Sequence, residues 1–257
     1  MSQSKQHLNH PILGKLVKEF RPKISRKLIT TINITLVFIY FGFVFGVFPL
    51  FIVGLQQGSF SLILVLGCLI VSGVLAYRIV NILKDRLFIY DKGLVYQSSN
   101  KTRVINFSDI MALWQYSARY YLYFIIPNGR TTYEYTIETK DGKKIVIDEI
   151  IANEELGKYL NYELFKHLMP SLKFNYALGK EVVFGEITIS KKGIKVKNAT
   201  LPWLDIKSID ISAGKLYIKK KNSGWLDKNW YVTEVSTIYN LYIFIEMTNA
   251  ILNSGIP

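Results

Sequence analysis

The sequence predicts a membrane α-hairpin followed by a mainly β (α+β) globular region, and three observations support this fold class. No Lys, Arg, Asp, Glu or His occurs from Leu28 to Tyr77, although charged residues form 20% of the chain. Beyond this gap, alternating apolar and polar residues separated by turn signals are typical of antiparallel strands. The same order of strand, turn and helix signals then recurs about one hundred residues later, which indicates an internal repeat.

The uncharged stretch is long enough for two membrane-spanning helices. A spanning helix needs about 20 apolar residues, because the hydrocarbon core of a bilayer is about 30 Å thick. Glycine, glutamine and serine at 54–59 mark a turn within the stretch. We therefore predict a transmembrane hairpin over residues 28–84, with spans at about 31–53 and 61–82. Gly42 and Gly46 have the helical spacing that permits close packing of the two helices.

The charges beside the hairpin predict its orientation. The net charge is +13, and residues 1–27 carry seven Lys and Arg against one Glu. Because basic residues flank both ends of the hairpin and none lies in its turn, both termini are expected in the cytoplasm. Residues 1–27 also carry apolar residues at helical spacing, namely Ile12, Leu13, Leu16, Val17 and Phe20. This spacing predicts a short amphipathic helix on the inner leaflet, and a juxtamembrane segment packed on the globular region is the equal alternative.

The globular region begins with strand signals and ends its first part with a helix. Asp91-Lys92-Gly93 separates two apolar runs and predicts a β-hairpin, and Asp141-Gly142 predicts another tight turn. A helix is expected over about Asn153–Leu168, with Asn153 as its N-cap and Pro170 as its stop. The first unit therefore covers residues 85–172.

Residues 173–257 repeat these signals and form a second unit. Lys191-Lys192-Gly193 repeats the first hairpin turn. Trp203-Leu204-Asp205-Ile206 repeats Phe107-Ser108-Asp109-Ile110, since each has an aromatic residue, any residue, Asp and Ile before a strand. A closing helix is expected over about Glu234–Leu252. Agreement across several consecutive features favours a true repeat over coincidence.

This order of elements resembles the pleckstrin-homology-like domains of bacterial membrane proteins, which commonly follow a transmembrane hairpin. The resemblance covers about Arg86 to Asn253 as two copies. It implies two tandem β-sandwich or roll units, each closed by a C-terminal helix, at the inner face of a bacterial plasma membrane. It also implies that these units bind a ligand or a partner and do not catalyse a reaction.

No catalytic or metal-binding constellation is recognisable in the sequence. His7 and His10 lie in a polar N-terminal tail, His167 is alone and Cys68 is the single cysteine, so no known metal-binding motif is present. Asp148-Glu149 and Glu154-Glu155 fall near a predicted helix start, where negative charge complements the helix dipole. We therefore expect a protein that is not an enzyme and that uses no cofactor or metal.

Two sets of residues are candidates for binding. The first is a lysine face that would contact anionic lipid headgroups or a protein, and it comprises Lys191, Lys192, Lys195, Lys197, Lys219, Lys220 and Lys221. Lys195 and Lys197 are two residues apart on an expected strand and so would share one face. The alternative is a solvated, solubilising face. The second is an aromatic surface of Trp114, Tyr116, Tyr120 and Tyr121, for which core packing is the alternative.

These features together predict a membrane-tethered binding or scaffold protein. Its cytoplasmic units would engage a protein partner or anionic lipid, and no nucleic acid is expected, because the basic segment adjoins a membrane segment. An accessory subunit of a membrane transporter or complex is the alternative, and homo-oligomer formation stays open. The stretch from Leu28 to Tyr77, which forms most of both spans, contains no Lys, Arg, Asp, Glu or His, and this argues against a proton or ion path.

Overall fold

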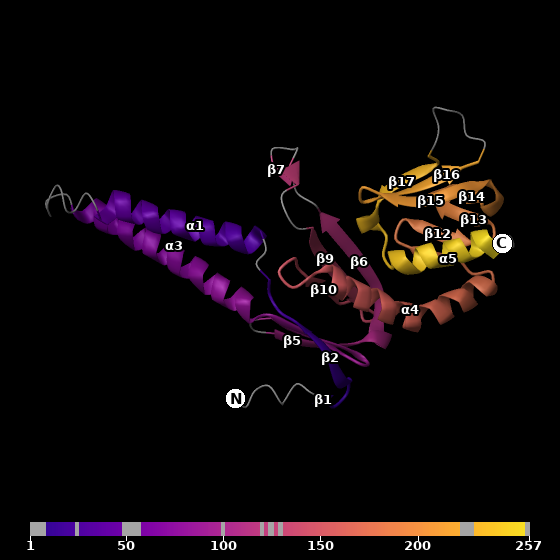
Figure 1. The fold of residues 1–257 in the computed structure, drawn as a ribbon, viewed down its shortest axis with the longest axis horizontal. Helices are drawn as coiled ribbons and strands as arrows, with labels where there is room; N and C mark the ends of the chain where they lie inside the picture. The colour runs from indigo at the N-terminus through magenta and orange to yellow at the C-terminus, as the bar shows by residue number, and fades with distance from the viewer. Residues whose placement is uncertain are drawn as a thin grey trace.

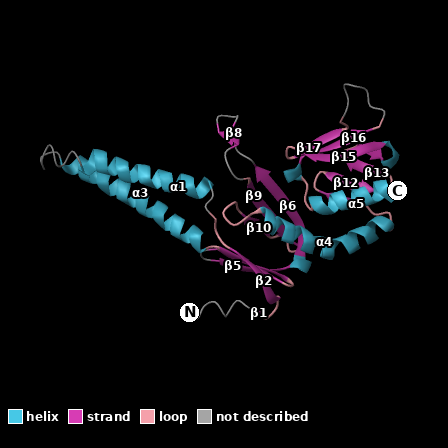
Figure 2. Cartoon of the chain, in the orientation of Figure 1, coloured by secondary structure: helices cyan, strands magenta, loops and turns pink. Residues whose placement is uncertain are grey.

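A computed structural model describes residues 9–23, 26–47, 58–98, 101–118, 121–122, 126–127, 131–221 and 229–254. The chain is mainly β, and the described residues also form four α-helices. Figure 1 shows a pair of helices, α1 (Arg26–Gly42) and α3 (Gly58–Lys84), that extends away from the strands. A π-helical segment, η1 (Phe43–Val47), continues α1. The two helices pack side by side, and the other two helices lie against the sheets (Figure 2).

The expected N-terminal amphipathic helix is wrong, because these residues form the strand β2 (Gly14–Phe20). β2 pairs antiparallel with β3 (Arg86–Tyr90), and Phe20 lies opposite Leu87. Leu13 and Phe20 are buried in the cores, whereas Ile12 and Val17 are exposed. The chance helical spacing of these apolar residues is therefore overridden by pairing with a strand that lies about seventy residues away in the sequence.

The helical hairpin thus lies between two neighbouring strands of one sheet. This first sheet has the order β1-β2-β3-β4-β5, and its remaining strands are β1 (Asn9–His10), β4 (Gly93–Ser98) and β5 (Lys101–Asn106). A second sheet has the order β10-β9-β6, with β6 (Ile110–Ala118), β9 (Thr132–Thr139) and β10 (Lys144–Ile147). A short ladder joins β7 (Tyr121–Leu122) to β8 (Ile126–Pro127).

Helix α4 (Glu154–Ala177) packs in two hydrophobic cores. Asn153 is its N-cap as predicted, since its side-chain oxygen accepts a hydrogen bond from Leu156 N at 3.0 Å. The predicted stop at Pro170 is wrong, because the helix continues through this residue for two further turns. Its first half, including Leu160 and Leu164, packs in the core of the first half of the chain, and Met169 packs in the core of the second. Packing on both sides therefore outweighs the helix-breaking tendency of proline.

The second half repeats the first in the order of its elements. Its four-stranded sheet contains β11 (Val182–Phe184), β12 (Ile187–Ser190), β13 (Gly193–Val196) and β14 (Ala199–Pro202). Its three-stranded sheet contains β15 (Ile206–Ser212), β16 (Lys215–Lys220) and β17 (Tyr231–Glu234). The closing helix α5 (Leu241–Ser254) begins later than predicted, since Glu234 ends β17 and a 3-10 turn, η5 (Val235–Thr237), follows.

The two copies agree in local detail. Gly93 and Gly193 occupy equivalent hairpin positions, where an added Cβ atom would lie 2.2 Å from Ile105 O and 2.0 Å from Leu201 O. The repeated aromatic-x-Asp-Ile segments form the equivalent 3-10 turns η3 (Phe107–Asp109) and η4 (Trp203–Asp205), and both aromatic side chains are buried. The Asp109 carbonyl accepts from Lys140 N at 2.8 Å, and the Asp205 carbonyl accepts from Lys221 N at 2.7 Å. Each glycine and each turn therefore has a structural reason for its recurrence.

Asn240 ties the second half to the first. Its side-chain oxygen accepts from Leu113 N at 3.0 Å, and its side-chain nitrogen donates to Met111 O at 2.9 Å. Its backbone N–H donates to Leu113 O at 2.8 Å. Asn240 is 5% exposed and left-handed, with φ of 53°. One residue of the second half thus occupies the outer edge of β6 in the place of a neighbouring strand.

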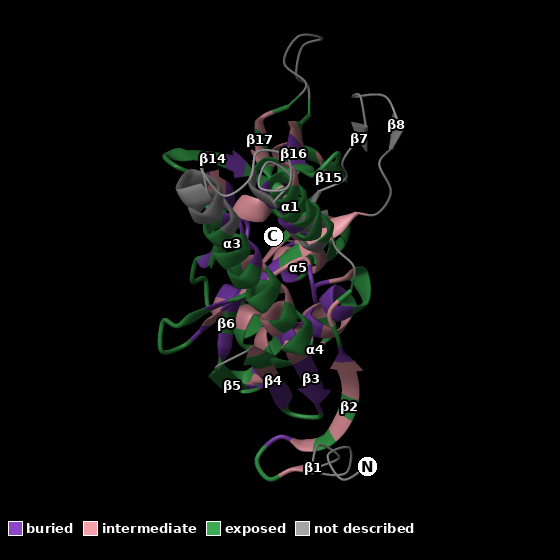
Figure 3. Ribbon diagram, turned by 90° about the vertical axis from the view of Figure 1, so that its left-hand side faces the viewer, coloured by how far each residue is buried: buried purple, intermediate pink, exposed green. Residues whose placement is uncertain are grey.

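The helical hairpin exposes many apolar side chains. Figure 3 shows that most described residues of α1 and α3 are exposed, and these include Leu36, Phe41, Ile70 and Val74. Inside the hairpin, Gly42 packs so closely that a Cβ atom there would lie 2.7 Å from Cys68 Cβ. In the described part of the chain, one helix, Leu66–Lys84, is long and apolar enough to cross a membrane, and the apolar helix Ile29–Phe45 is shorter. Residues 48–57 of the predicted spans and turn lie outside the described residues.

Candidate binding sites

The predicted lysine face begins at the β12–β13 turn of the second half. Lys191 lies over the Tyr176 ring, with its Nζ 4.6 Å from the ring centroid. Lys195 Nζ lies 3.3 Å from Glu181 Oε1. Lys197 follows β13 and has a left-handed φ of 53°, so it does not share a strand face with Lys195 as predicted. Lys192 is exposed in the turn itself. The turn is thus cationic, but the shared strand face predicted for Lys195 and Lys197 does not form.

The second predicted cluster lies at the end of β16. Lys219 and Lys220 are the last residues of this strand, and Lys221 follows it. Lys219 Nζ lies 2.9 Å from Asp210 Oδ2 on β15, and the hydrogen bond lowers the pKa of the Asp210 carboxyl. Part of the positive charge of this cluster is therefore neutralised locally.

The predicted aromatic surface is described for two of its four residues. The Trp114 ring meets the Tyr239 ring edge-on at 5.4 Å between centroids, and Lys144 Nζ lies 4.8 Å from the Trp114 ring centroid. Trp114 and Tyr116 line a recess of about 290 Å³ that also contacts Ser236 of the second half. Tyr120 and the side chain of Tyr121 lie outside the described residues. Trp114 is therefore a packing residue at the junction of the two halves as well as a partly exposed one.

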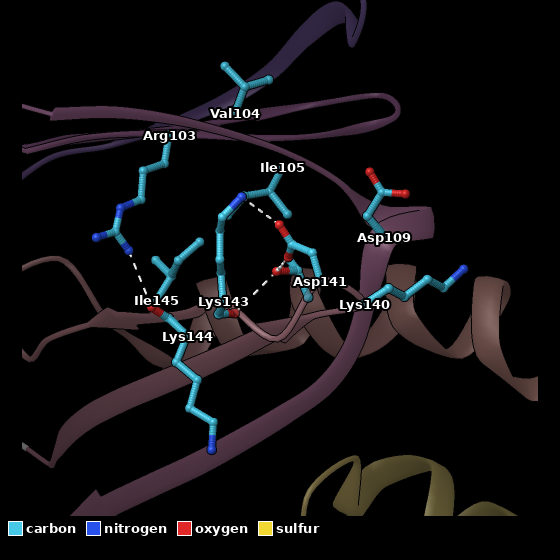
Figure 4. Close-up of a pocket in the computed structure, with 10 residues that line it drawn as sticks. Arg103, Val104, Ile105, Asp109, Lys140, Asp141, Lys143, Lys144 and Ile145 are labelled. Atoms are coloured by element: carbon cyan, nitrogen blue, oxygen red, sulfur yellow. Dashed lines mark hydrogen bonds and ion pairs between the residues drawn. The ribbon is translucent and has the colours of Figure 1, made fainter.

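A larger groove, which the sequence did not reveal, lies between β5 and the β9–β10 turn. It encloses about 740 Å³, and its lining is shown in Figure 4. Ile105 and Ile145, each 4% exposed, contribute apolar surface from the two strands. Charged side chains of both signs surround them, namely Arg103, Asp109, Lys140, Asp141, Lys143 and Lys144. The groove thus combines an apolar interior with a charged rim, as ligand sites commonly do.

One polar contact crosses the groove and links its walls, since Arg103 Nη1 donates to Lys144 O at 3.3 Å (Figure 4). At one end of the groove, Lys140 N donates to Asp109 O at 2.8 Å and continues the pairing of β6 with β9. On the turn, Lys143 Nζ lies 2.5 Å from Asp141 Oδ2, and Thr139 also donates to this carboxylate. These hydrogen bonds lower the pKa of Asp141 to about 2, so the carboxylate is ionised at neutral pH. Lys144 pairs with Glu138 at 3.2 Å on the outer face of the sheet.

The groove was missed because its walls come from segments about forty residues apart. One signal was present in the sequence of β5, where Lys101, Arg103 and Ile105 alternate and so share a face. A charge on the same face as a core residue indicates that the sheet is open at that point. The described residues contain no group of three or more His, Cys, Asp and Glu side chains that could hold a metal ion.

The fold and these sites define a mainly β protein of two similar halves, with an apolar helical hairpin inserted into the first sheet. The chain belongs to the family described as "Family of unknown function (DUF6585)", which matches residues 1–255. No curated protein matches the chain. A solved structure, "Structure of the Spt16D Pob3N heterodimer", is similar at 18% identity and a TM-score of 0.23, covering 54% of this chain and 77% of the other.

Proposed function

We propose that this protein is a membrane-tethered, non-catalytic binding protein, in which the hairpin is the anchor and two pleckstrin-homology-like halves carry the binding surfaces. The apolar surface of α1 and α3 is the observation that carries this proposal. Soluble monomers rarely expose contiguous apolar patches above a few hundred Å². Both helices instead present large apolar side chains on all sides that do not face each other. Lipid is the surrounding that stabilises such a surface.

The dimensions of the helices support the proposal. α3 has 27 residues, and α1 has 17 residues before the 5 residues of η1. At about 1.5 Å per residue, these lengths correspond to roughly 40 Å and 33 Å, against about 30 Å of hydrocarbon core. Arg78 and Lys84 lie in the last turns of α3, and Arg86 follows it. Basic residues at this end favour a cytoplasmic location for both halves, because positive charge is retained on that side.

The anchor is tested by fractionation of the full chain expressed in a bacterium. We expect the protein to sediment with membranes, to resist extraction at alkaline pH and to require detergent for release. A Cys68→Ser, Asn249→Cys variant should react with a membrane-impermeant maleimide only after the cells are broken. Protein that stays in the supernatant without detergent would refute the anchor. Labelling in intact cells would refute the orientation.

The binding role of the lysine turn is tested separately. Lysines near an anionic leaflet each contribute about 1 kcal/mol. We expect the backbone amides of residues 190–197 to exchange more slowly in nanodiscs of acidic lipid than in nanodiscs of neutral lipid. A variant in which four lysines are replaced by glutamate (Lys191→Glu, Lys192→Glu, Lys195→Glu and Lys197→Glu) should show the same exchange in both lipids. The control variant Lys173→Glu, on the exposed face of α4, should keep the difference in exchange. Equal exchange in both lipids would contradict a lipid-binding role for the turn.

A further inference from the structure

The groove in the first half is bordered by two open strand edges. Among the described residues, β5 pairs with β4 alone and β10 pairs with β9 alone. Asn240 covers the outer edge of β6 at Met111 and Leu113, and β1 has two residues. The edges of β5 and β10 both border the groove. Open edges expose unpaired N–H and C=O groups and pair readily with another extended segment.

Arg103 lies on the open edge of β5, at the position where such a segment would pair. It lies in the row Leu87, Tyr96 and Arg103 across three strands, on the same face as the core residue Ile105. Its guanidinium reaches across the groove to Lys144 O and has no carboxylate partner in the described part of the chain. An inward charge on an edge strand prevents indiscriminate pairing. An incoming strand that places a carboxylate opposite Arg103 would remove this obstacle.

We propose that the groove between β5 and β10 binds an extended, acidic segment of a partner protein by strand addition. The proposal rests on the function proposed above, of which it names the binding site and the partner chemistry. A carboxylate would accept the two parallel hydrogen bonds of the Arg103 guanidinium. Lys144 O would then be free to accept a hydrogen bond from the backbone of the segment. Apolar side chains two residues away along the segment would cover Ile105 and Ile145.

The charges on the rim favour this occupant over a phosphorylated headgroup. Asp141 is ionised and paired with Lys143, and Asp109 lies at the end of the groove, next to the β9–β10 turn. The rim carries four cationic side chains against these two carboxylates, so it attracts negative charge, but a compact group with several negative charges would also lie close to the two aspartates. A peptide can place its single carboxylate at Arg103 and neutral residues beside the two aspartates. Backbone groups on both walls also match an extended chain better than a headgroup.

The test uses the full chain in nanodiscs of neutral lipid and a phage library of random eight-residue peptides. We expect enriched peptides with an acidic residue between apolar residues, and we expect them to slow amide exchange in residues 101–106 and 144–147. Arg103→Glu should weaken their binding about tenfold or more, which is the loss expected when one partner of an Arg–carboxylate pair is removed. Lys173→Glu is the matched control and should bind normally.

A charge swap separates a lost contact from a lost fold. Peptides whose acidic residue is changed to Lys should bind Arg103→Glu better than the wild-type protein. The proposal is overturned if no peptide is enriched, if Arg103→Glu binds the peptides unchanged, or if protection appears elsewhere. It is also overturned if acidic lipid alone protects residues 101–106, which would identify a headgroup site. Sedimentation with membranes is measured independently. If the protein sediments with membranes but binds no peptide, peptide binding in the groove is refuted and the membrane anchor is not.

Discussion

Replacing Asn240 should weaken the junction between the two halves of the protein. Asn240→Ala removes both side-chain hydrogen bonds to the β6 edge, at 3.0 Å to Leu113 N and 2.9 Å to Met111 O. Each buried backbone group left without a partner costs about 1 to 3 kcal/mol. Alanine at a φ of 53° costs about 1 kcal/mol more, because only glycine and asparagine adopt this conformation readily. We therefore expect a total loss of about 3 to 7 kcal/mol.

Two further variants divide this loss into its physical parts. Asn240→Gly removes the same hydrogen bonds without the backbone strain, so it should be about 1 kcal/mol less destabilising than Asn240→Ala. Asn249→Ala, on the exposed side of α5, is the matched control and should change stability by less than about 0.5 kcal/mol.

Urea unfolding of the full chain in detergent, followed by circular dichroism, gives the free energies. Amide exchange at Leu113 provides a direct measure of the lost contact. We expect this amide to exchange faster in both Asn240 variants and at the normal rate in Asn249→Ala. If Asn240→Ala cost less than about 1 kcal/mol and left Leu113 protected, the inference that one asparagine fastens the halves would be wrong.

The remaining predictions concern a glycine and a tyrosine of the first half. Gly93→Ala should destabilise the protein by about 3 kcal/mol, because its Cβ would overlap Ile105 O. Gly142 has open space around it but a φ of 77°, so Gly142→Ala should lower the stability measured by thermal unfolding by only about 1 kcal/mol. Equal losses of stability in Gly93→Ala and Gly142→Ala would contradict the steric argument. Burial raises the pKa of Tyr96 to about 12, with smaller contributions from Asp85 and Asp148. The folded state thus favours the neutral phenol, and this stabilisation is complete below about pH 10 and lost as the pH rises toward 12. Tyr96→Phe should raise the pH midpoint of alkaline unfolding, whereas Tyr162→Phe on exposed α4 surface should not.

Much of the fold was predictable because it is encoded locally. The turn at Asp91-Lys92-Gly93 forms as expected, with Tyr90 paired to Gly93, and the same pairing joins Ser190 to Gly193. The Asn153 cap was likewise readable, because a capping residue acts on backbone N–H groups two or three positions away. These features depend on a few consecutive residues, and no distant part of the chain competes with them.

The errors arose where distant contacts decide the structure. β2 depends on pairing with β3, and α4 passes Pro170 because two cores hold it. The groove depends on Arg103 and Lys144, which belong to different sheets. Among the lysines, the left-handed backbone of Lys197 could not be read from alternation, which assumes that the strand continues. Spacing along the chain carries no information on which edges remain open.

The position of the hairpin explains how a pair of helices can be inserted into a sheet without disrupting it. β2 and β3 are neighbours, so their ends lie about 4.8 Å apart, and packed helices need only 8 to 10 Å between axes. α3 reaches β3 with Asp85 alone between them, and the Leu83 carbonyl at the end of the helix accepts a hydrogen bond from Arg86 at 2.8 Å. Ser98 at the end of β4 donates to Asp85 Oδ2 at 3.2 Å and fastens this junction to the sheet. α1 is joined to β2 through several intervening residues, from Arg21 onward. A tilt of the hairpin would therefore move the first sheet mainly through the direct connection of α3 to β3. The movement would then be transmitted across the sheet to β5, whose edge borders the groove.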